Sequence, residues 1–154
     1  IRILQVYPQM NNAGTERVIL KFNENIDTTQ VQFDFLVERS GELDEKLFIW
    51  VEKFTICMKK DKTYYSALLQ FFSEHTEYKV VHTILMNGWA GIEGSPKMWR
   101  TMQIAHSHNA RNDLPKLAAF VKGISSIPLE KAATHFFACS SNAAKWLFPH
   151  KVKD

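Results

Sequence analysis

The sequence has few cysteines and no long apolar run, and both absences narrow the possible classes of protein. Only Cys57 and Cys139 occur among the 154 residues. Each lies in an apolar segment, which predicts buried thiols in a reducing compartment rather than a disulfide or a metal pair. No uninterrupted apolar stretch reaches the ~18 residues that a membrane-spanning helix needs. The first residues also lack the apolar core and cleavage site of a signal peptide, so a cytoplasmic location is expected.

The sequence also lacks a large excess of charge of either sign, since the net charge is +3 and no five consecutive residues carry like charges. The densest basic patch, at 58–62, is typical of a solvated turn. Nucleic-acid binding would need a broader basic face with aromatic stacking partners, so no nucleic-acid partner is expected. The glycine-rich dinucleotide fingerprint and the P-loop motif are both missing, which excludes the conventional forms of those nucleotide sites.

The residues that are present favour one folded domain over 1–154. Hydrophobic residues make up 45% and charged residues 23% of the chain, and neither repeats nor low-complexity tracts occur. β-rich segments alternate with segments of helical periodicity. Strands are predicted at 1–7, 31–37, 54–58, 78–84, 102–106 and 134–139, and helices near 18–26, 43–51, 64–74, 117–124 and 141–147. This alternation predicts an α/β fold, a doubly wound and mostly parallel sheet with helices on both faces.

Prolines are expected to delimit several of these elements. Pro8 is predicted to end the first strand, because proline cannot donate to a strand ladder. Pro128 is predicted to kink the fourth helix or to restart it near Ser125, and Pro149 to end the last helix. The glycine- and proline-containing segment 87–96 is expected to hold a short or broken helix.

Polar residues collect where the predicted strands end. His106, Ser107, His108 and Asn109 follow an apolar strand, and His82 lies near the end of the preceding one. The turn at 11–15 and Ser140 occupy the corresponding places after the first and last strands. Because ligands bind at the carboxyl ends of parallel strands, these groups are expected to share one rim.

The chemistry expected of this rim is anion and hydroxyl binding. A strand, a turn containing Gly14 and a helix leave free backbone N–H groups at the helix start, which suits a phosphate. A neutral imidazole at His106 or His108 can bond a sugar hydroxyl or a phosphate.

Simpler or different interpretations of the same residues stay open. His82 can be a half-buried packing residue, Glu16 a carboxylate that complements the helix dipole, and Ser140 a helix cap. The His106–His108 pair also begins some hydrolase metal centres, but these need further ligands. The other histidines, His75, His135 and His150, are poorly placed to supply these ligands. The tryptophans Trp89, Trp99 and Trp146 are expected to serve packing.

Several segments together resemble the family 4 glycosyltransferases, the group 1 GT-B enzymes of bacterial capsule and exopolysaccharide synthesis. Residues 10–16 (Met-Asn-Asn-Ala-Gly-Thr-Glu) are similar to the family's Asn-x-Gly-Gly-x-Glu turn. Residues 79–82 (Lys-Val-Val-His) resemble its Asp-Val-Val-His segment. The stretches 31–37, 104–109 and 133–140 resemble its second strand, its strand-five motif and the segment before the final helix. The matches span the chain in the family's order.

The resemblance implies the amino-terminal, Rossmann-like domain of a retaining, metal-independent enzyme without a cofactor. A nucleotide-sugar donor would supply the sugar, by front-face attack, to a polysaccharide or lipid-linked acceptor. His106 would contact the transferred sugar as the catalytic residue. The donor diphosphate would face Ala13, Gly14 and Thr15, and the acceptor would be bound by Asn12, Glu16, His82, His108, Asn109 and Arg111, with Ser140 also on the rim.

Two departures from the family pattern bear on these expectations. Ala13 replaces the first glycine of the turn, which predicts a stiffer or shifted turn. The chain stops at Asp154, without the family's carboxyl-terminal nucleotide-binding domain, which would be this domain's partner. We therefore expect no turnover from these residues alone.

Two other functions stay open beside the enzyme. A non-catalytic module that binds a glycan or a protein is the main alternative, and a His-x-His metal hydrolase is the second. The resemblance also suggests peripheral contact with the inner face of the plasma membrane. The residues that would make this contact are Lys59, Lys60, Lys62, Tyr64 and Tyr65.

Overall fold

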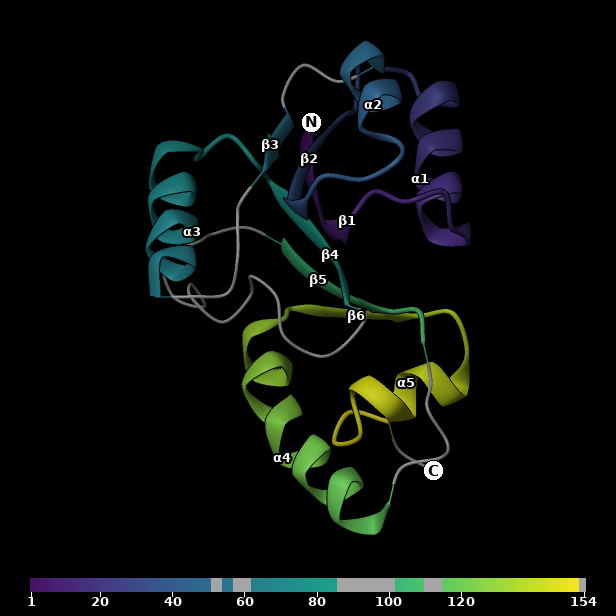
Figure 1. Cartoon of the computed structure of the whole chain (residues 1–154), viewed down its shortest axis with the longest axis vertical. Helices are drawn as coiled ribbons and strands as arrows, with labels where there is room; N and C mark the ends of the chain where they lie inside the picture. Colours follow the sequence, from purple (N-terminus) through teal and green to yellow (C-terminus); the bar gives the residue numbers. More distant parts are fainter. Residues whose placement is uncertain (51–53, 57–61, 86–101, 110–114, 153–154) are drawn as a thin grey trace.

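The computed structural model describes residues 1–50, 54–56, 62–85, 102–109 and 115–152. Strands and helices alternate along the chain (Figure 1). The strands are β1 (Arg2–Gln9), β2 (Gln32–Arg39), β3 (Phe54–Ile56), β4 (Val80–Leu85), β5 (Met102–Ser107) and β6 (His135–Ala138). The helices are α1 (Gly14–Asn25), α2 (Asp44–Trp50), α3 (Lys62–Glu74), α4 (Lys116–Ala132) and α5 (Ser141–Leu147).

The strands form one sheet in the order β3-β2-β1-β4-β5-β6, and every neighbouring pair is parallel. The predicted doubly wound α/β fold is therefore confirmed. The strand order reverses between β1 and β4, which are side by side. Such a reversal opens a crevice at the carboxyl ends of the strands, where ligands bind in folds of this class.

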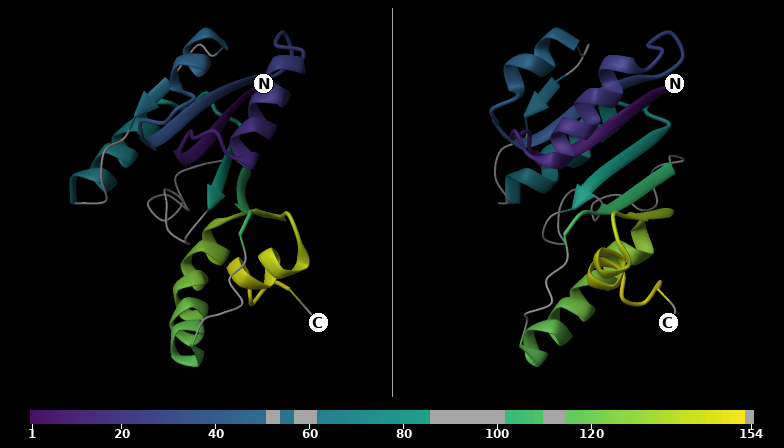
Figure 2. Two further views of the ribbon diagram at one scale, coloured as in Figure 1. Left: turned by 45° about the vertical axis from the view of Figure 1, so that its right-hand side comes forward. Right: turned by 90° about the vertical axis from the view of Figure 1, so that its right-hand side faces the viewer.

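Side chains on a strand alternate between the two faces of the sheet, and this divides the core into separate clusters. One face packs against α3, and the opposite face packs against α1 and α2 (Figures 1 and 2). The cluster on the α3 face is Leu4, Val6, Leu36, Leu68, Phe71, Phe72, Tyr78 and Val81. The cluster on the α1 face is Tyr7, Met10, Ile19, Phe35, Val37, Leu43, Leu47 and Ile84.

A third cluster joins α4 and α5 to the other end of the sheet. It contains Ala105, Leu129, Ala132, Ala133, Leu147 and Phe148, and the half-buried Trp146 packs against it, as predicted. Ala105 lies on the sheet face opposite to His106. Within the described residues, the α1 face of β4, β5 and β6 therefore contributes only Ile84 to a core cluster.

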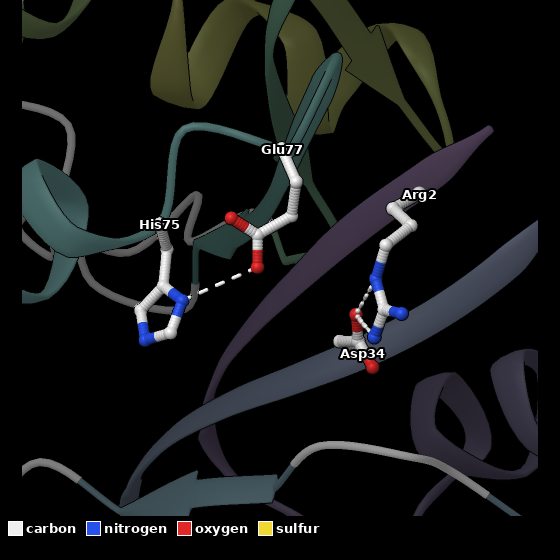
Figure 3. A network of polar contacts seen from close by, with 4 residues as sticks. All are labelled: Arg2, Asp34, His75 and Glu77. Atoms are coloured by element: carbon white, nitrogen blue, oxygen red, sulfur yellow. Dashed lines mark hydrogen bonds and ion pairs between the residues drawn. The ribbon is translucent and has the colours of Figure 1, made fainter.

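A buried ion pair ties the first two strands together on the α3 face. Arg2 Nε lies 2.9 Å from Asp34 Oδ2, and the Asp34 side chain is 1% exposed (Figure 3). The buried hydroxyl of Tyr78 has a raised pKa, first because of burial and then because of the nearby Asp34 charge. His75 Nδ1 lies 3.2 Å from Glu77 Oε1 in the adjoining segment.

Two predictions about proline were wrong, namely that Pro8 ends the first strand and that the fourth helix restarts near Ser125. Pro8 lies within β1, because the pairing of β1 with β4 ends at Val6 and no β4 partner requires the missing N–H. Pro128 lies inside α4, which does not restart at Ser125. The carbonyl that loses its donor belongs to Ile124, which is 53% exposed, so water can replace the lost bond.

The prediction of a buried Cys139 was also wrong. This thiol is free and exposed, because it follows the edge strand β6, whose residues are themselves mostly exposed. Other predictions fall outside the described residues, namely those for Cys57, for the helix at 87–96 and its Trp89, for Trp99, and for the side chains Lys59, Lys60, Lys62, Tyr64 and Tyr65. In the described part of the chain, no helix has both the length and the apolar character needed to cross a bilayer.

Candidate functional site

A cavity of about 350 Å³ lies between α1 and the sheet face of β1, β4, β5 and β6. This volume is in the range of small-molecule sites. Its walls are mainly apolar towards the amino ends of the strands and carry polar groups towards the carboxyl ends. The side chains that line it are Ile3, Gln5, Tyr7, Thr15, Val18, Ile19, Phe22, Phe33, Val80, His82, Ile84, Ile104, His106, His108 and Phe137.

Three histidines contribute to the polar part of the cavity wall, and the neighbouring strands β4 and β5 position them. His82 Nε2 lies 2.9 Å from His106 Nδ1, and the rings of His106 and His108 have centroids 4.1 Å apart. The strand alternation explains the second contact, because residues two apart share a face. The predicted pairing of His106 and His108 on one side of an extended segment is confirmed.

These histidines are neutral at pH 7. Burial lowers the pKa of His82 to about 4, with a smaller contribution from the neighbouring imidazoles. Burial also lowers the pKa of His106 to about 4, with His108 adding to the effect. The pKa of His108 is lowered by burial, although the charge of Glu16 opposes the shift. Neutral imidazoles both donate and accept hydrogen bonds, which suits a ligand rich in hydroxyl groups.

Phe137 extends this wall onto the edge strand. It pairs with His106 across β5 and β6, and the ring of Phe137 meets that of His106 edge-on at 5.8 Å between centroids. The side chain is 49% exposed. An exposed aromatic ring beside polar groups offers an apolar surface to a ligand that also makes hydrogen bonds.

The start of α1 borders the cavity through Thr15. No side chain caps α1 at Ala13, so the first turn of the helix keeps backbone donors without a side-chain partner. A Cβ atom built on Gly14 would meet no atom within 4 Å. Open space at an uncapped helix start allows close approach of an anion to the backbone.

A second glycine holds the turn between β1 and α1 in place. A Cβ on Gly41 would come within 2.2 Å of the Met10 carbonyl oxygen, so the loop after β2 packs directly on the backbone after β1. The Leu43 N–H donates to that same carbonyl at 3.0 Å. Nothing in the sequence indicated this backbone contact.

Glu16 lies behind the turn as a buried carboxylate. It is 4% exposed and accepts a hydrogen bond from Thr15 Oγ1 at 2.9 Å. Its charge adds to burial in raising the pKa of Tyr7 and favours the protonated form of His108. Glu16 therefore faces both of these groups as well as occupying the first turn of α1, where an anion complements the helix dipole.

The structure brings together part of the predicted site. Thr15, His82, His106 and His108 line one cavity, and Gly14 and Ala13 immediately precede Thr15. His82 differs from the prediction because it lies mid-strand, paired with Gln5, rather than near the end of β4.

Other predicted residues lie outside the cavity wall. The Asn12 side chain accepts a hydrogen bond from Arg17 Nε at 2.7 Å, and Asn109 is exposed beyond β5. Ser140 Oγ accepts from the Ala143 N–H at 3.1 Å, so the predicted cap is confirmed and this oxygen is engaged there. Arg111 falls outside the described residues.

Metal binding finds no support in the described residues. No group of three or more histidine, cysteine, aspartate or glutamate side chains there is arranged to hold an ion. His75 and His150 instead lie next to carboxylates, Glu77 and Glu130.

Gln5, Tyr7 and Phe137 are among the cavity residues that the sequence did not identify. One signal was available for Gln5, a polar residue within an otherwise apolar strand that proves to be 2% exposed. A scan of the chain against protein-family models gives no match, and a search of curated proteins gives none either.

Proposed function

We propose that this chain is the amino-terminal, acceptor-side domain of a retaining glycosyltransferase. The enzyme would transfer a sugar from a nucleotide-sugar donor to a polysaccharide or lipid-linked acceptor. The observation that carries the proposal is one cavity in which the neutral His106 and His108 lie close to the uncapped start of α1. Imidazoles suit the hydroxyl groups of a sugar, and free backbone N–H groups suit a diphosphate.

In this proposal the domain orients the reactants and stabilises charge. His106 holds the transferred sugar in place, and the backbone at Gly14 stabilises the negative charge that develops on the departing diphosphate. The residues assigned to the acceptor in this proposal are His108, His82 and Glu16, together with Asn12, Asn109 and Arg111. The resemblance described above supplies the reaction type, and a second, nucleotide-binding domain of the same polypeptide is the proposed partner.

The same proposal places the enzyme in the cytoplasm, with peripheral contact at the inner face of the plasma membrane. Flotation of the protein with liposomes that contain anionic lipid tests this contact, and failure to float would contradict it.

Transfer is measured on the complete polypeptide that the reading frame encodes. A panel of UDP- and GDP-hexoses serves as donors, with extracted membrane lipid and capsular glycan as acceptors, and release of the nucleoside diphosphate is followed. We expect His106→Ala to lower turnover about 100-fold, because a poorly held sugar reacts slowly. The melting temperature should stay close to that of the unaltered protein.

His135→Ala is the matched control, since this histidine is exposed on β6 and does not line the cavity. We expect it to retain turnover. Equal rates for His106→Ala and the unaltered enzyme would remove His106 from the site, and no release from any donor would contradict the enzymatic function.

A glycan-binding module without chemistry is the second candidate. The apolar cavity wall, together with Phe22 at 62% exposure and Phe137 at 49%, favours it, because such a surface binds without needing catalytic groups. Calorimetric titration of the 154-residue chain with capsular oligosaccharide tests this candidate. Binding without any diphosphate release from the complete polypeptide would favour the module.

A further inference from the structure

Three polar side chains cross the sheet face that lines the cavity. Gln5 and His82 are register partners on β1 and β4, and His82 and His106 are diagonal neighbours on β4 and β5. His82 Nδ1 lies 2.8 Å from Gln5 Oε1, and His82 Nε2 lies 2.9 Å from His106 Nδ1. Gln5, His82 and His106 are therefore joined in a single row of hydrogen bonds, which we call the relay.

The chemistry of the end group decides where the protons lie. An amide oxygen can only accept a hydrogen bond, so His82 Nδ1 must donate to Gln5. A neutral imidazole has one N–H, which leaves Nε2 of His82 as an acceptor. His106 must then donate from Nδ1, and its Nε2 keeps a lone pair. This assignment requires both rings to be neutral, which agrees with their lowered pKa values.

The last atom of the relay is the one that a ligand can use. Within the described residues no hydrogen-bond partner is recorded for His106 Nε2, and the ring of His106 lines the cavity. A lone pair at that atom accepts a hydrogen bond and cannot donate one. A sugar hydroxyl fits this requirement, whereas a fully ionised phosphate, which has no proton to offer, does not.

We propose that Gln5 and His82 are positioning residues that hold His106 with its proton on Nδ1, so that Nε2 accepts a hydrogen bond from a ligand hydroxyl. The proposal rests on the proposed function for the identity of the ligand, and on hydrogen bonding alone for the proton positions. The titratable groups around the relay are His108, whose ring contacts His106, Tyr7 of the cavity wall, and Glu16 behind the turn.

The proton positions are measured on the 154-residue chain without any ligand. Long-range ¹H–¹⁵N correlation spectra of ¹⁵N-histidine-labelled protein distinguish protonated from unprotonated ring nitrogens at pH 7. We expect His82 and His106 both to carry the proton on Nδ1. A proton on Nε2 of His106 in the unaltered protein would overturn the proposal.

Gln5→Met tests the origin of this state. The substitution keeps the length of the side chain and removes the amide oxygen, so the His106 signals should shift towards the Nε2-protonated form, which a free imidazole prefers. Gln103→Met is the matched control, since Gln103 is also buried, at 6% exposure, and lies on the adjacent part of the same sheet outside the cavity wall. Unchanged His106 signals in Gln5→Met would overturn the role of Gln5, and if this variant does not fold, the unaltered protein alone decides.

The transfer assay separates this proposal from the proposed function. In the complete polypeptide, Gln5→Met should lower kcat about 10-fold, less than the loss in His106→Ala, because it changes only the fraction of correctly protonated rings. If transfer depends on His106 but Gln5→Met leaves the His106 tautomer unchanged, only the role of the relay is contradicted. If Gln5→Met changes the tautomer but the complete polypeptide transfers no sugar, only the enzymatic function is contradicted.

Discussion

Two polar networks lie on opposite faces of the sheet, and they end differently. On the α3 face, Arg2 and Asp34 form an ion pair in which the carboxylate is almost completely buried (Figure 3). On the α1 face, the relay of Gln5, His82 and His106 starts at a buried amide and ends at a ring that lines a cavity. In the first network the buried carboxylate is paired within the protein, whereas the second network ends at a ring that a ligand can reach.

This difference indicates which polar groups serve stability and which serve binding. A buried charge must be paired inside the protein, because an unpaired one costs several kcal/mol. A neutral imidazole can leave one nitrogen without a protein partner at a lower cost, since that atom can bond water or a ligand in the cavity. Function is therefore expected on the α1 face, where the cavity lies between α1 and the strands β1, β4, β5 and β6.

Removal of Asp34 should produce the largest loss of stability. Asp34→Ala leaves the Arg2 guanidinium without its buried partner, and we expect the free energy of unfolding to fall by about 3 kcal/mol in urea titrations. Glu24→Ala, which breaks the exposed Lys21–Glu24 pair on α1, is the control and should change stability very little. A loss below about 1 kcal/mol for Asp34→Ala would contradict a stabilising role for this buried ion pair.

The two glycines near the cavity should respond in opposite ways. Gly41→Ala forces a Cβ against the Met10 carbonyl and should cost about 2 kcal/mol in the same titrations, as overpacking does. Gly14→Ala meets open space and should leave stability nearly unchanged. Under the proposed function, however, it should raise KM for the nucleotide sugar in the complete polypeptide. Equal destabilisation by both substitutions would show that Gly14, too, serves the fold.

The network on the α1 face should make stability depend on pH. His82 and His106 bind protons near pH 4 in the folded chain and near 6.5 in the unfolded chain. The unfolded state therefore binds more protons below pH 6.5, and the free energy of unfolding falls as the pH is lowered towards 4.

We expect a slope of about 1 kcal/mol per pH unit between pH 6.5 and 5, after allowance for partial exposure of both rings. The measurement is urea unfolding at pH 7, 6 and 5. The double variant His82→Gln/His106→Gln should have a flatter profile over that range. Parallel profiles for the double variant and the unaltered protein would contradict the neutral, buried state of the histidines.

The order of the elements followed from the sequence with little ambiguity. Apolar runs such as 31–37 and 102–106 are short, β-rich and separated by segments of helical periodicity, and a parallel sheet is the arrangement that such a pattern favours. The His106–His108 pair was also predictable, because side chains two apart on a strand must share a face. The Ser140 cap followed for a similar local reason, since its hydroxyl reaches the helix start three residues ahead.

Contacts between distant segments were not predictable from the same patterns. Pro8 is tolerated inside β1 only because the β4 pairing has already ended, and Cys139 is exposed only because β6 lies at the edge of the sheet. Gln5 gave a weak signal as a polar residue in an apolar strand, but its partner lies 77 positions away.

The sequence by itself determined the alternation of strands and helices and the polar residues that follow the strands, since these depend on local periodicity and backbone chemistry. Only the tertiary structure decided that His82 lies between Gln5 and His106, that Gly14 faces open space, and that the α1 face holds a cavity. These features depend on strand order and register, which bring residues into contact through the packing of the whole sheet rather than through their spacing along the chain.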